Sequence, residues 1–378
     1  MKRIVFIDYI RVFACFLVML VHASENFYGA PGSTDMAGPQ SFLASESDRL
    51  WVSLYDGFSR MAVPLFMIVS AFLLVPLREG QTAIEFYRRR ALRIIPPFLI
   101  FIILYSTVPL LWNQIDVETS ARDLSRTFLN FPTLAGHLWF MYPLIGLYLF
   151  IPVISPWLAK VSAKEERFFL ILFAISTCMP YLNRWCGEIW GQCFWNEFHL
   201  LWYFSGYLGY LVLAHYIRVH LDWSIGKRMA VGIGLTVVGA IWTILSFYVQ
   251  AVPGILHSTP TLEIGWSFCT INCLMLTAGC FLMFTCIRKS KTPRIILQLS
   301  NLSYGMYLMH IFWLGMWTSI IKTGVGMPSV TAIPVIAVCT FICCWITCYI
   351  ISCLPGGKWV IGTETVSRGS SRNILAAD

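Results

Sequence analysis

The stretch IDYIRVFACFLVMLVHASE, residues 7–25, decides the fold because it is apolar enough to lie in a lipid bilayer. It nevertheless carries Asp8 and Arg11 near its start and His22 near its end. Charge inside a membrane span is costly and usually faces a protein interior or a water-filled cavity. We therefore predict that this segment is a membrane helix that also contributes to a functional site.

Asp8, Arg11 and His22 are spaced so that they share one face of a helix. Asp8 and Arg11 are three residues apart and are therefore neighbours. Arg11 and His22 are eleven residues apart, which is close to three full turns and a rise of about 16 Å. This spacing predicts a polar seam across most of the membrane. A simpler alternative is an Asp8–Arg11 pair that ties the helix to a neighbour, with His22 at the interface.

The composition of the whole chain is typical of a polytopic, all-α membrane protein. Of the 378 residues, 57% are hydrophobic and only 12% are charged, whereas soluble domains carry about 25% charged residues. A membrane helix needs about 20 mostly apolar residues. We predict about ten transmembrane helices, near residues 4–23, 52–77, 94–112, 137–157, 167–183, 198–217, 229–250, 264–287, 302–321 and 330–354.

The net charge of +8 is explained by topology rather than by a nucleic-acid partner. With the N-terminus in the cytoplasm, twenty of the 27 Lys and Arg residues fall on the cytoplasmic side and five fall outside. Cytoplasmic loops carry such an excess of positive charge. We therefore place both termini in the cytoplasm and expect a transmembrane domain over residues 1–357 with a polar cytoplasmic tail, 358–378.

Most of the thirteen cysteines lie within predicted spans, where cysteine behaves as a small apolar residue. We expect no metal site. Cys186 and Cys193 differ because both fall in a predicted outer loop, RWCGEIWGQCFW. Disulfides form in oxidising compartments such as a periplasm. The sequence leaves open whether these two cysteines form one.

Polar and aromatic residues at the outer ends of other spans extend the seam. We expect them to bind a substrate; the alternative is that the aromatic residues anchor the interface and that the histidines only pack. These residues are Arg60, His137, Trp139, Tyr142, Tyr304 and His310.

An arginine cluster, EFYRRRALRIIPPF at residues 85–98, precedes the third predicted span. Arginine binds phosphate through a planar, bidentate fork. Arg88, Arg90 and Arg93 are therefore candidates to bind a phosphate-bearing cosubstrate. The alternative is that the cluster sets topology and contacts anionic lipid head groups.

These motifs together resemble the membrane-bound acyltransferase-3 family. The resemblance is carried by Arg11-x10-His22, Arg90-x-x-Arg93 and four longer stretches, which run in family order over almost the whole chain: VPLFMIVSAFLL, HLWFMYPLIGLY, SYGMYLMH and LPGGKWVIG. Ala71 stands where members often have glycine. Because the chain ends soon after its last span, we expect the stand-alone O-acetyltransferase type, similar to the enterobacterial common antigen O-acetyltransferase.

The resemblance implies an integral O-acyltransferase, most simply an O-acetyltransferase, of the bacterial inner membrane. Its donor would be cytoplasmic acyl-CoA, usually acetyl-CoA, a cosubstrate and not a bound cofactor. Its acceptor would be a hydroxyl of a cell-surface glycan or lipid-linked saccharide at the outer face. The resemblance also implies that Arg11 and His22 are the essential pair, and that residues 1–357 form the acyltransferase-3 transmembrane domain.

We expect the nucleotide phosphates on the arginine cluster, with Arg11 lining the path of the acyl arm and Asp8 holding Arg11. His22 is the expected general base, because the pKa of histidine lies near neutral pH. The residues leave open whether His22 is instead acylated itself, and whether Arg11 or Arg60 stabilises the oxyanion. Glu25 is a candidate to orient His22.

The main alternative is a transporter or flippase for a small anion or a lipid-linked sugar. Intramembrane charge fits that function equally well, but transporters often contain internal repeats, and the sequence shows none. The sequence does not identify the acceptor, the acyl group or the oligomeric state.

Overall fold

The computed structural model describes residues 3–29, 38–187 and 198–363, and most of these residues are helical. A short antiparallel pair, β1 (Gln40–Phe42) with β2 (Leu256–Ser258), joins Gln40 to Ser258. The longer helices are α1 (Val5–Glu25), α2 (Glu46–Ser59), α3 (Ala62–Leu74), α4 (Ala83–Thr107), α6 (Met141–Leu158), α7 (Ala163–Ser176), α9 (Tyr207–Val219), α10 (Ile225–Tyr248), α12 (Ile271–Phe284), α13 (Arg294–Thr318) and α14 (Ser329–Ser352).

Short helices connect these elements and complete the all-α class predicted from composition. They are α5 (Val117–Ser125), α8 (Met179–Cys186), α11 (Thr259–Leu262), α15 (Gly357–Ile361), the 3₁₀ helices η1 (Val108–Trp112), η2 (Gly136–Phe140), η3 (His199–Phe204) and η4 (Glu263–Trp266), and the π-helix η5 (Ser319–Val325). The predicted tail, 358–378, begins within α15, and residues 364–378 lie outside the described part of the chain.

Eight helical segments of the described chain are long and apolar enough to cross a membrane. They are Val5–Glu25, Glu46–Leu74, Ala83–Trp112, Gly136–Leu158, Ala163–Cys186, Ile225–Tyr248, Thr259–Phe284 and Ser329–Ser352. The count of ten and the cytoplasmic placement of both termini stay predictions.

The two predicted spans outside this set differ from it for separate reasons. The segment 198–217 breaks at Gly206, whose φ of +72° favours glycine, and only the 13 residues of α9 follow it. The segment 302–321 lies largely in α13, whose 25 residues suffice in length. The serine, asparagine, tyrosine and histidine side chains of α13 lower the mean hydropathy of this helix.

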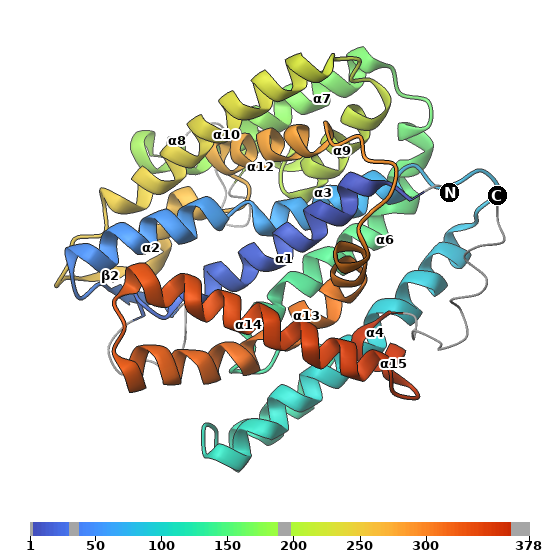
Figure 1. Cartoon of the computed structure of the whole chain (residues 1–378). Helices are drawn as coiled ribbons and strands as arrows, with labels where there is room; N and C mark the ends of the chain where they lie inside the picture. Colours follow the sequence, from blue (N-terminus) through green and yellow to red (C-terminus); the bar gives the residue numbers. More distant parts are fainter. Residues whose placement is uncertain (1–2, 30–37, 188–197, 364–378) are drawn as a thin grey trace.

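α1 lies inside the helix bundle rather than at its edge (Figure 1). It packs against α2, α3, α13 and α14, and Ile10, Ala14 and Met19 are fully buried along its length. Its polar residues therefore face other helices and not lipid.

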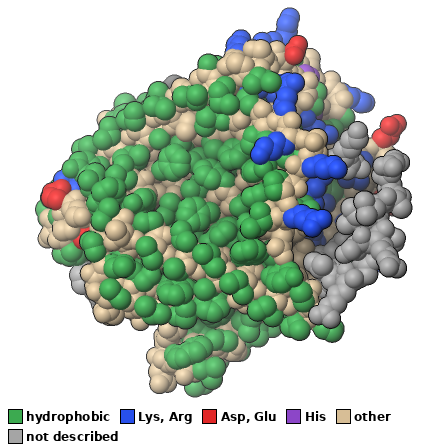
Figure 2. Space-filling view, viewed as in Figure 1, with side chains coloured by type: hydrophobic (Ala, Val, Ile, Leu, Met, Phe, Trp, Pro, Cys, Tyr) green, Lys and Arg blue, Asp and Glu red, His purple; other side chains and the backbone are tan. Residues whose placement is uncertain are grey.

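The side chains divide the visible surface into an apolar region and a basic end (Figure 2). Hydrophobic side chains cover most of this face, as expected for a surface in contact with lipid tails. Lys and Arg side chains gather at the right-hand end of this view, where α1 begins. The Lys and Arg residues that the sequence assigned mostly to one side of the membrane thus gather at one end of the molecule.

α10 and α12 approach closely because glycines face the contact. A Cβ at Gly239 would lie 2.5 Å from the backbone nitrogen of Leu276, whereas a Cβ at Gly234 on the same helix would meet nothing within 4 Å. We expect Gly239→Ala to destabilise the fold by about 1–3 kcal/mol through overpacking. Thermal unfolding in detergent measures this, with Gly234→Ala as the matched control. Equal melting temperatures for the two variants would contradict the close contact.

Candidate active site

The last turn of α1 presents His22 with a carboxylate partner. The Nδ1 of His22 lies 2.6 Å from Oε2 of Glu25, and the side chains are 14% and 7% exposed. Because a carboxylate accepts, the proton of the neutral imidazole resides on Nδ1, and Nε2 carries the lone pair. The structure thus gives His22 the geometry of an oriented base, with Glu25 in the orienting position.

Two further histidines from distant segments surround His22. His310 of α13 stacks on it with ring centroids 5.1 Å apart, and His137 of η2 lies at 6.4 Å. The rings of His137 and His310 are 4.8 Å apart. The structure therefore brings together all three histidines that the sequence offered as separate candidates. We call His22, His137 and His310 the histidine cluster.

Backbone carbonyls fix the tautomers of the two buried histidines. Nε2 of His137 donates to the carbonyl oxygen of Leu308 at 3.3 Å, and Nδ1 of His310 donates to that of Tyr307 at 2.5 Å. The remaining ring nitrogens are acceptors. His137 Nδ1 and His310 Nε2 are buried, and neither has a hydrogen-bond partner among the described residues. The cluster thus holds two acceptors that are ready for a donor group.

A cleft leads from the basic end of the molecule toward this cluster. Two adjoining cavities, with volumes of about 110 and 350 Å³, form it. The larger cavity is at the lower end of the range of ligand sites. The cavities share the lining residues Arg11, Ser70, Arg90, Arg93 and Tyr148, so they adjoin, and we call the two together the arginine cleft.

Tyr307 connects the inner end of the arginine cleft to the histidine cluster. It lines the inner cavity, its hydroxyl donates to the carbonyl oxygen of His137 at 2.6 Å, and its ring lies 5.9 Å from those of both His137 and His310. Phe140, which also lines the cavity, contacts the same tyrosine ring at 5.8 Å. A single layer of side chains therefore separates the cavity from the histidines.

Uncompensated positive charge lines the cleft. Arg11, Arg78, Arg90 and Arg93 contribute to it, and within the described ranges the structure records no ion pair for any of them. The Nε of Arg90 is buried without a hydrogen-bond partner there. Clefts of one sign of charge concentrate ligands of the opposite sign. The arrangement therefore suits an anionic ligand such as a phosphate.

Asp8 lines the same cleft but does not hold Arg11. It accepts hydrogen bonds from Arg3, Thr292 and Ser300 at 2.8 Å each. Instead of pairing with Arg11, Asp8 thus joins the start of α1 to Thr292, just before α13, and to Ser300 within α13. Arg11 remains available for a ligand, and Arg3 neutralises Asp8.

Arg88 lies apart from the other two predicted phosphate ligands. It is exposed and lines neither cavity. Residues two apart on a helix point to nearly opposite sides, whereas residues three apart share a face. The helical spacing thus places Arg90 and Arg93 on the face that lines the cleft and Arg88 on another face. Arg78 and Arg3, which sequence reasoning did not select, complete the basic lining.

Arg60 is held by acids at the junction of α2 and α3. Its Nε lies 2.6 Å from Asp56, and its second nitrogen lies 3.3 Å from Glu263. Tyr28 contributes its hydroxyl to the same network, 2.7 Å from Glu263. The Arg60 charge is thus compensated inside the protein, at the junction between the two helices.

The three aromatic candidates take different positions. Tyr304 lines the arginine cleft and donates to the carbonyl oxygen of Ile94 at 2.8 Å. Trp139 stacks on Phe268 with ring centroids 5.4 Å apart. The hydroxyl of Tyr142 is buried without a partner in the described part of the chain. Of the two cysteines in the predicted outer loop, Cys186 is exposed and forms no disulfide with another described cysteine, and Cys193 lies outside the described residues.

Comparison with known proteins identifies the family of the chain. A family model described as an acyltransferase domain, Acyl_transf_3, matches residues 4–349 of the 378-residue chain. No curated protein and no solved structure matches the chain. The matched region includes the histidine cluster and every residue of the arginine cleft except Arg3. The chain therefore belongs to the acyltransferase-3 family and is a multi-pass membrane acyltransferase.

Proposed function

We propose that the protein transfers an acyl group, most simply acetyl, from acyl-CoA to a hydroxyl of a cell-surface glycan or lipid-linked saccharide. The observation that carries this proposal is that the arginine cleft ends at Tyr307, a residue that also contacts His137 and His310 of the histidine cluster. The arginine cleft suits an anionic donor, and the histidine cluster presents an oriented base. An O-acetyltransferase of the bacterial inner membrane combines both features.

The donor fits the cleft by charge and by shape. Coenzyme A carries a pyrophosphate and a further phosphate at one end, and a narrow pantetheine arm at the other. The phosphates would bind Arg78, Arg90 and Arg93, because guanidinium groups bind phosphate oxygens in pairs. The arm would then extend past Arg11 toward Tyr307. We place the basic end of the molecule in the cytoplasm, where acyl-CoA is made.

His22 would activate the acceptor. Its Nε2 takes the hydroxyl proton while the hydroxyl oxygen attacks the thioester carbonyl and forms a tetrahedral intermediate. The intermediate collapses as the carbon–sulfur bond breaks, and the proton passes to the departing CoA thiolate. Arg11 lies about 16 Å further along α1, so it is suited to the donor arm rather than to this carbonyl. Arg60, already paired with Asp56 and Glu263, supports the fold around the site.

The acceptor would meet the two orphan nitrogens of the cluster. His137 Nδ1 and His310 Nε2 are acceptors without a donor among the described residues, and a saccharide offers several hydroxyl donors. Leaving a buried acceptor unpaired costs about 1–3 kcal/mol. Binding a polyhydroxylated acceptor, or the amide groups of the donor arm, would recover this cost. The residues therefore favour a hydroxylic acceptor over an apolar one.

Turnover of acyl-CoA by the purified protein tests the proposal. The protein in detergent or nanodiscs is incubated with acetyl-CoA, and with succinyl-CoA for comparison, while binding and release of free CoA are measured. We expect saturable binding of acetyl-CoA and slow CoA release that a saccharide extract accelerates. A folded protein that binds neither thioester would overturn the donor assignment. Uptake of an anion or a lipid-linked sugar into proteoliposomes would then support the transporter alternative.

A further inference from the structure

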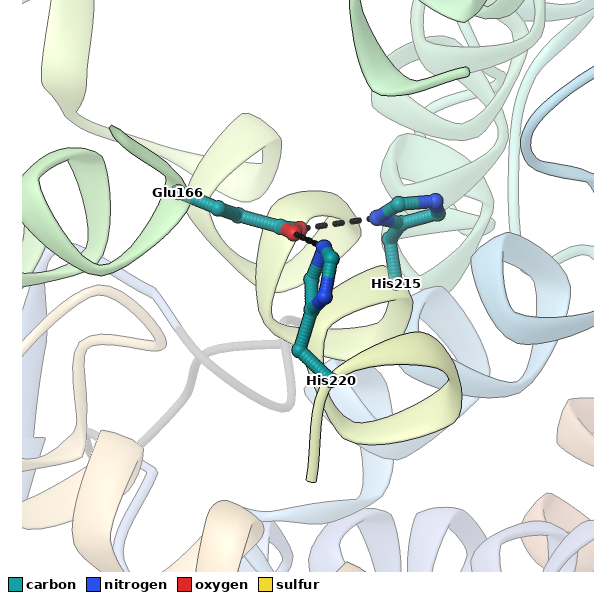
Figure 3. Close-up of side chains that lie close together, drawn as sticks. All are labelled: Glu166, His215 and His220. Carbon is teal, nitrogen blue, oxygen red and sulfur yellow. Dashed lines mark hydrogen bonds and ion pairs between the residues drawn. The ribbon is translucent and has the colours of Figure 1, made fainter. Parts of the chain in front are cut away.

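A second cluster of ionisable side chains lies outside the proposed active site (Figure 3). Glu166, in the first turn of α7, is completely buried, with 0% of its side chain exposed. Its two carboxylate oxygens face His215 Nδ1 at 2.9 Å and His220 Nε2 at 3.1 Å. His215 belongs to α9, and His220 caps the C-terminus of that helix. Two helices thus bring three potential metal ligands to one point.

The contact between Glu166 and His220 does not have the geometry of a hydrogen bond. Glu166 Oε2 and His220 Nε2 are both buried atoms without a hydrogen-bond partner in the described part of the protein, although they lie 3.1 Å apart. Buried polar groups are normally satisfied. Two lone-pair atoms that face the same space without bonding each other are expected where both point at a third atom. This is a separate reason, beyond proximity, to infer a ligand.

The three donor atoms have the spacing of a metal site. Each lies within 4.8 Å of the other two. Ligands bound about 2.1 Å from a tetrahedral zinc ion are roughly 3.4 Å apart. The 3.1 Å between Glu166 Oε2 and His220 Nε2 requires only a small shift to reach this value. His215 Nδ1, which lies 2.9 Å from the other carboxylate oxygen, would exchange that hydrogen bond for the ion. Among the described residues, Glu166 forms ion pairs with these two histidines alone, so no Lys or Arg neutralises it.

We propose that Glu166, His215 and His220 bind a zinc ion. Two imidazole nitrogens and one carboxylate oxygen are ligands that zinc accepts in tetrahedral sites, with the fourth position open to water. The ion would neutralise the buried carboxylate and satisfy the two orphan atoms at once. It would also join α7 to α9, two helices that contact each other.

The position of the site assigns it a structural role at a distance from the chemistry. Arg218, two residues before His220, donates to the carbonyl oxygens of Phe72 and Val75 at 2.8 and 3.1 Å. Phe72 belongs to α3, which supplies Ser70 and Leu73 to the arginine cleft. A zinc ion would therefore clamp α7 and α9 behind α3 without contacting the donor. This inference does not depend on the identity of the acyl donor or acceptor.

Metal content of the purified protein provides the first test. The full chain is purified in detergent through an affinity tag that contains no histidine, and bound metals are measured by mass spectrometry. We expect about one zinc ion per chain, and a loss of zinc affinity of at least tenfold in Glu166→Gln and in His220→Gln. Glu165→Gln and His257→Gln are the controls, because Glu165 is the exposed neighbour of Glu166, and His257 lies in β2 away from the cluster. Both controls should retain zinc.

Two further readouts keep the test independent of enzymatic activity. Cobalt added to the zinc-free protein should give the visible absorption of a tetrahedral site, and zinc should raise the melting temperature by roughly 5 °C when it is in large excess over its dissociation constant. His220→Gln serves if Glu166→Gln fails to fold, because His220 is 18% exposed. A protein that contains no zinc, with neither a cobalt spectrum nor a thermal shift, would overturn the proposal and leave a carboxylate–imidazole ion-pair cluster.

Discussion

His22→Ala is expected to lower acyl transfer by about 10²–10⁴-fold, the usual contribution of a general base, while binding of acetyl-CoA stays close to wild type. The reason is the separation of functions along α1. His22 Nε2 is presented by the bond from Nδ1 to Glu25, whereas the cleft is lined by Arg11 and not by His22. Single-turnover CoA release, combined with equilibrium binding of acetyl-CoA, measures the two effects separately.

Two variants sharpen this test. His257→Ala removes a histidine of β2 whose ring hydrogen-bonds the carbonyl oxygen of Val252, and it should leave transfer unchanged. Glu25→Gln should lower kcat but not KM for acetyl-CoA, and Glu25→Asp should restore part of kcat, because Glu25 acts through His22. If His22→Ala loses donor binding and turnover together, the histidine is part of the donor site, and its role as the base is wrong.

Removing the guanidinium of Arg90 or Arg93 is expected to weaken acetyl-CoA binding by at least about tenfold each, because hydrogen bonds to charged groups contribute about 1.5–3 kcal/mol. Both arginines line the two cavities that form the cleft, and neither is compensated by an acid within the described residues. The loss should be larger at low salt, because exposed charges are screened as salt rises. Isothermal titration of the detergent-solubilised Arg90→Ala and Arg93→Ala proteins measures it.

Arg88→Ala is the matched control for this prediction. Arg88 comes from the same helix and the same run of arginines but is exposed and lines neither cavity. It should bind acetyl-CoA as the wild type does. Equal weakening by Arg88→Ala and Arg93→Ala would show that the donor responds to the general positive potential of this end, and the specific phosphate site would be contradicted.

Local sequence patterns predicted the helical class and much of the candidate site. Apolar runs of about 20 residues identify membrane helices without tertiary information, because the bilayer sets their length. Helical spacing likewise placed Arg90 and Arg93 on one face, and both do line the cleft. The first helix, with Arg11 in the cleft and His22 beside two further histidines, follows the same periodicity.

The partners of these residues were not predictable, because they come from distant segments. Asp8 bonds Thr292 and Ser300, almost 300 positions along the chain, instead of its helical neighbour Arg11. Arg60 pairs with Glu263 in the same way. Residue spacing constrains only one helix at a time, so it shows which side chains share a face but not what packs against that face.

The polar character of α13 has a consequence for how the protein is made. This helix matches α4 in length, with 25 residues each, yet it is absent from the eight segments that qualify as spans. Segments of low hydropathy partition poorly from the translocon into lipid. α13 packs against α1 and α14, and its Ser300 bonds Asp8 of α1. The polar side chains of α13 are therefore covered by α1 and α14 together, so this helix reaches its final packing only after α14 has been synthesised.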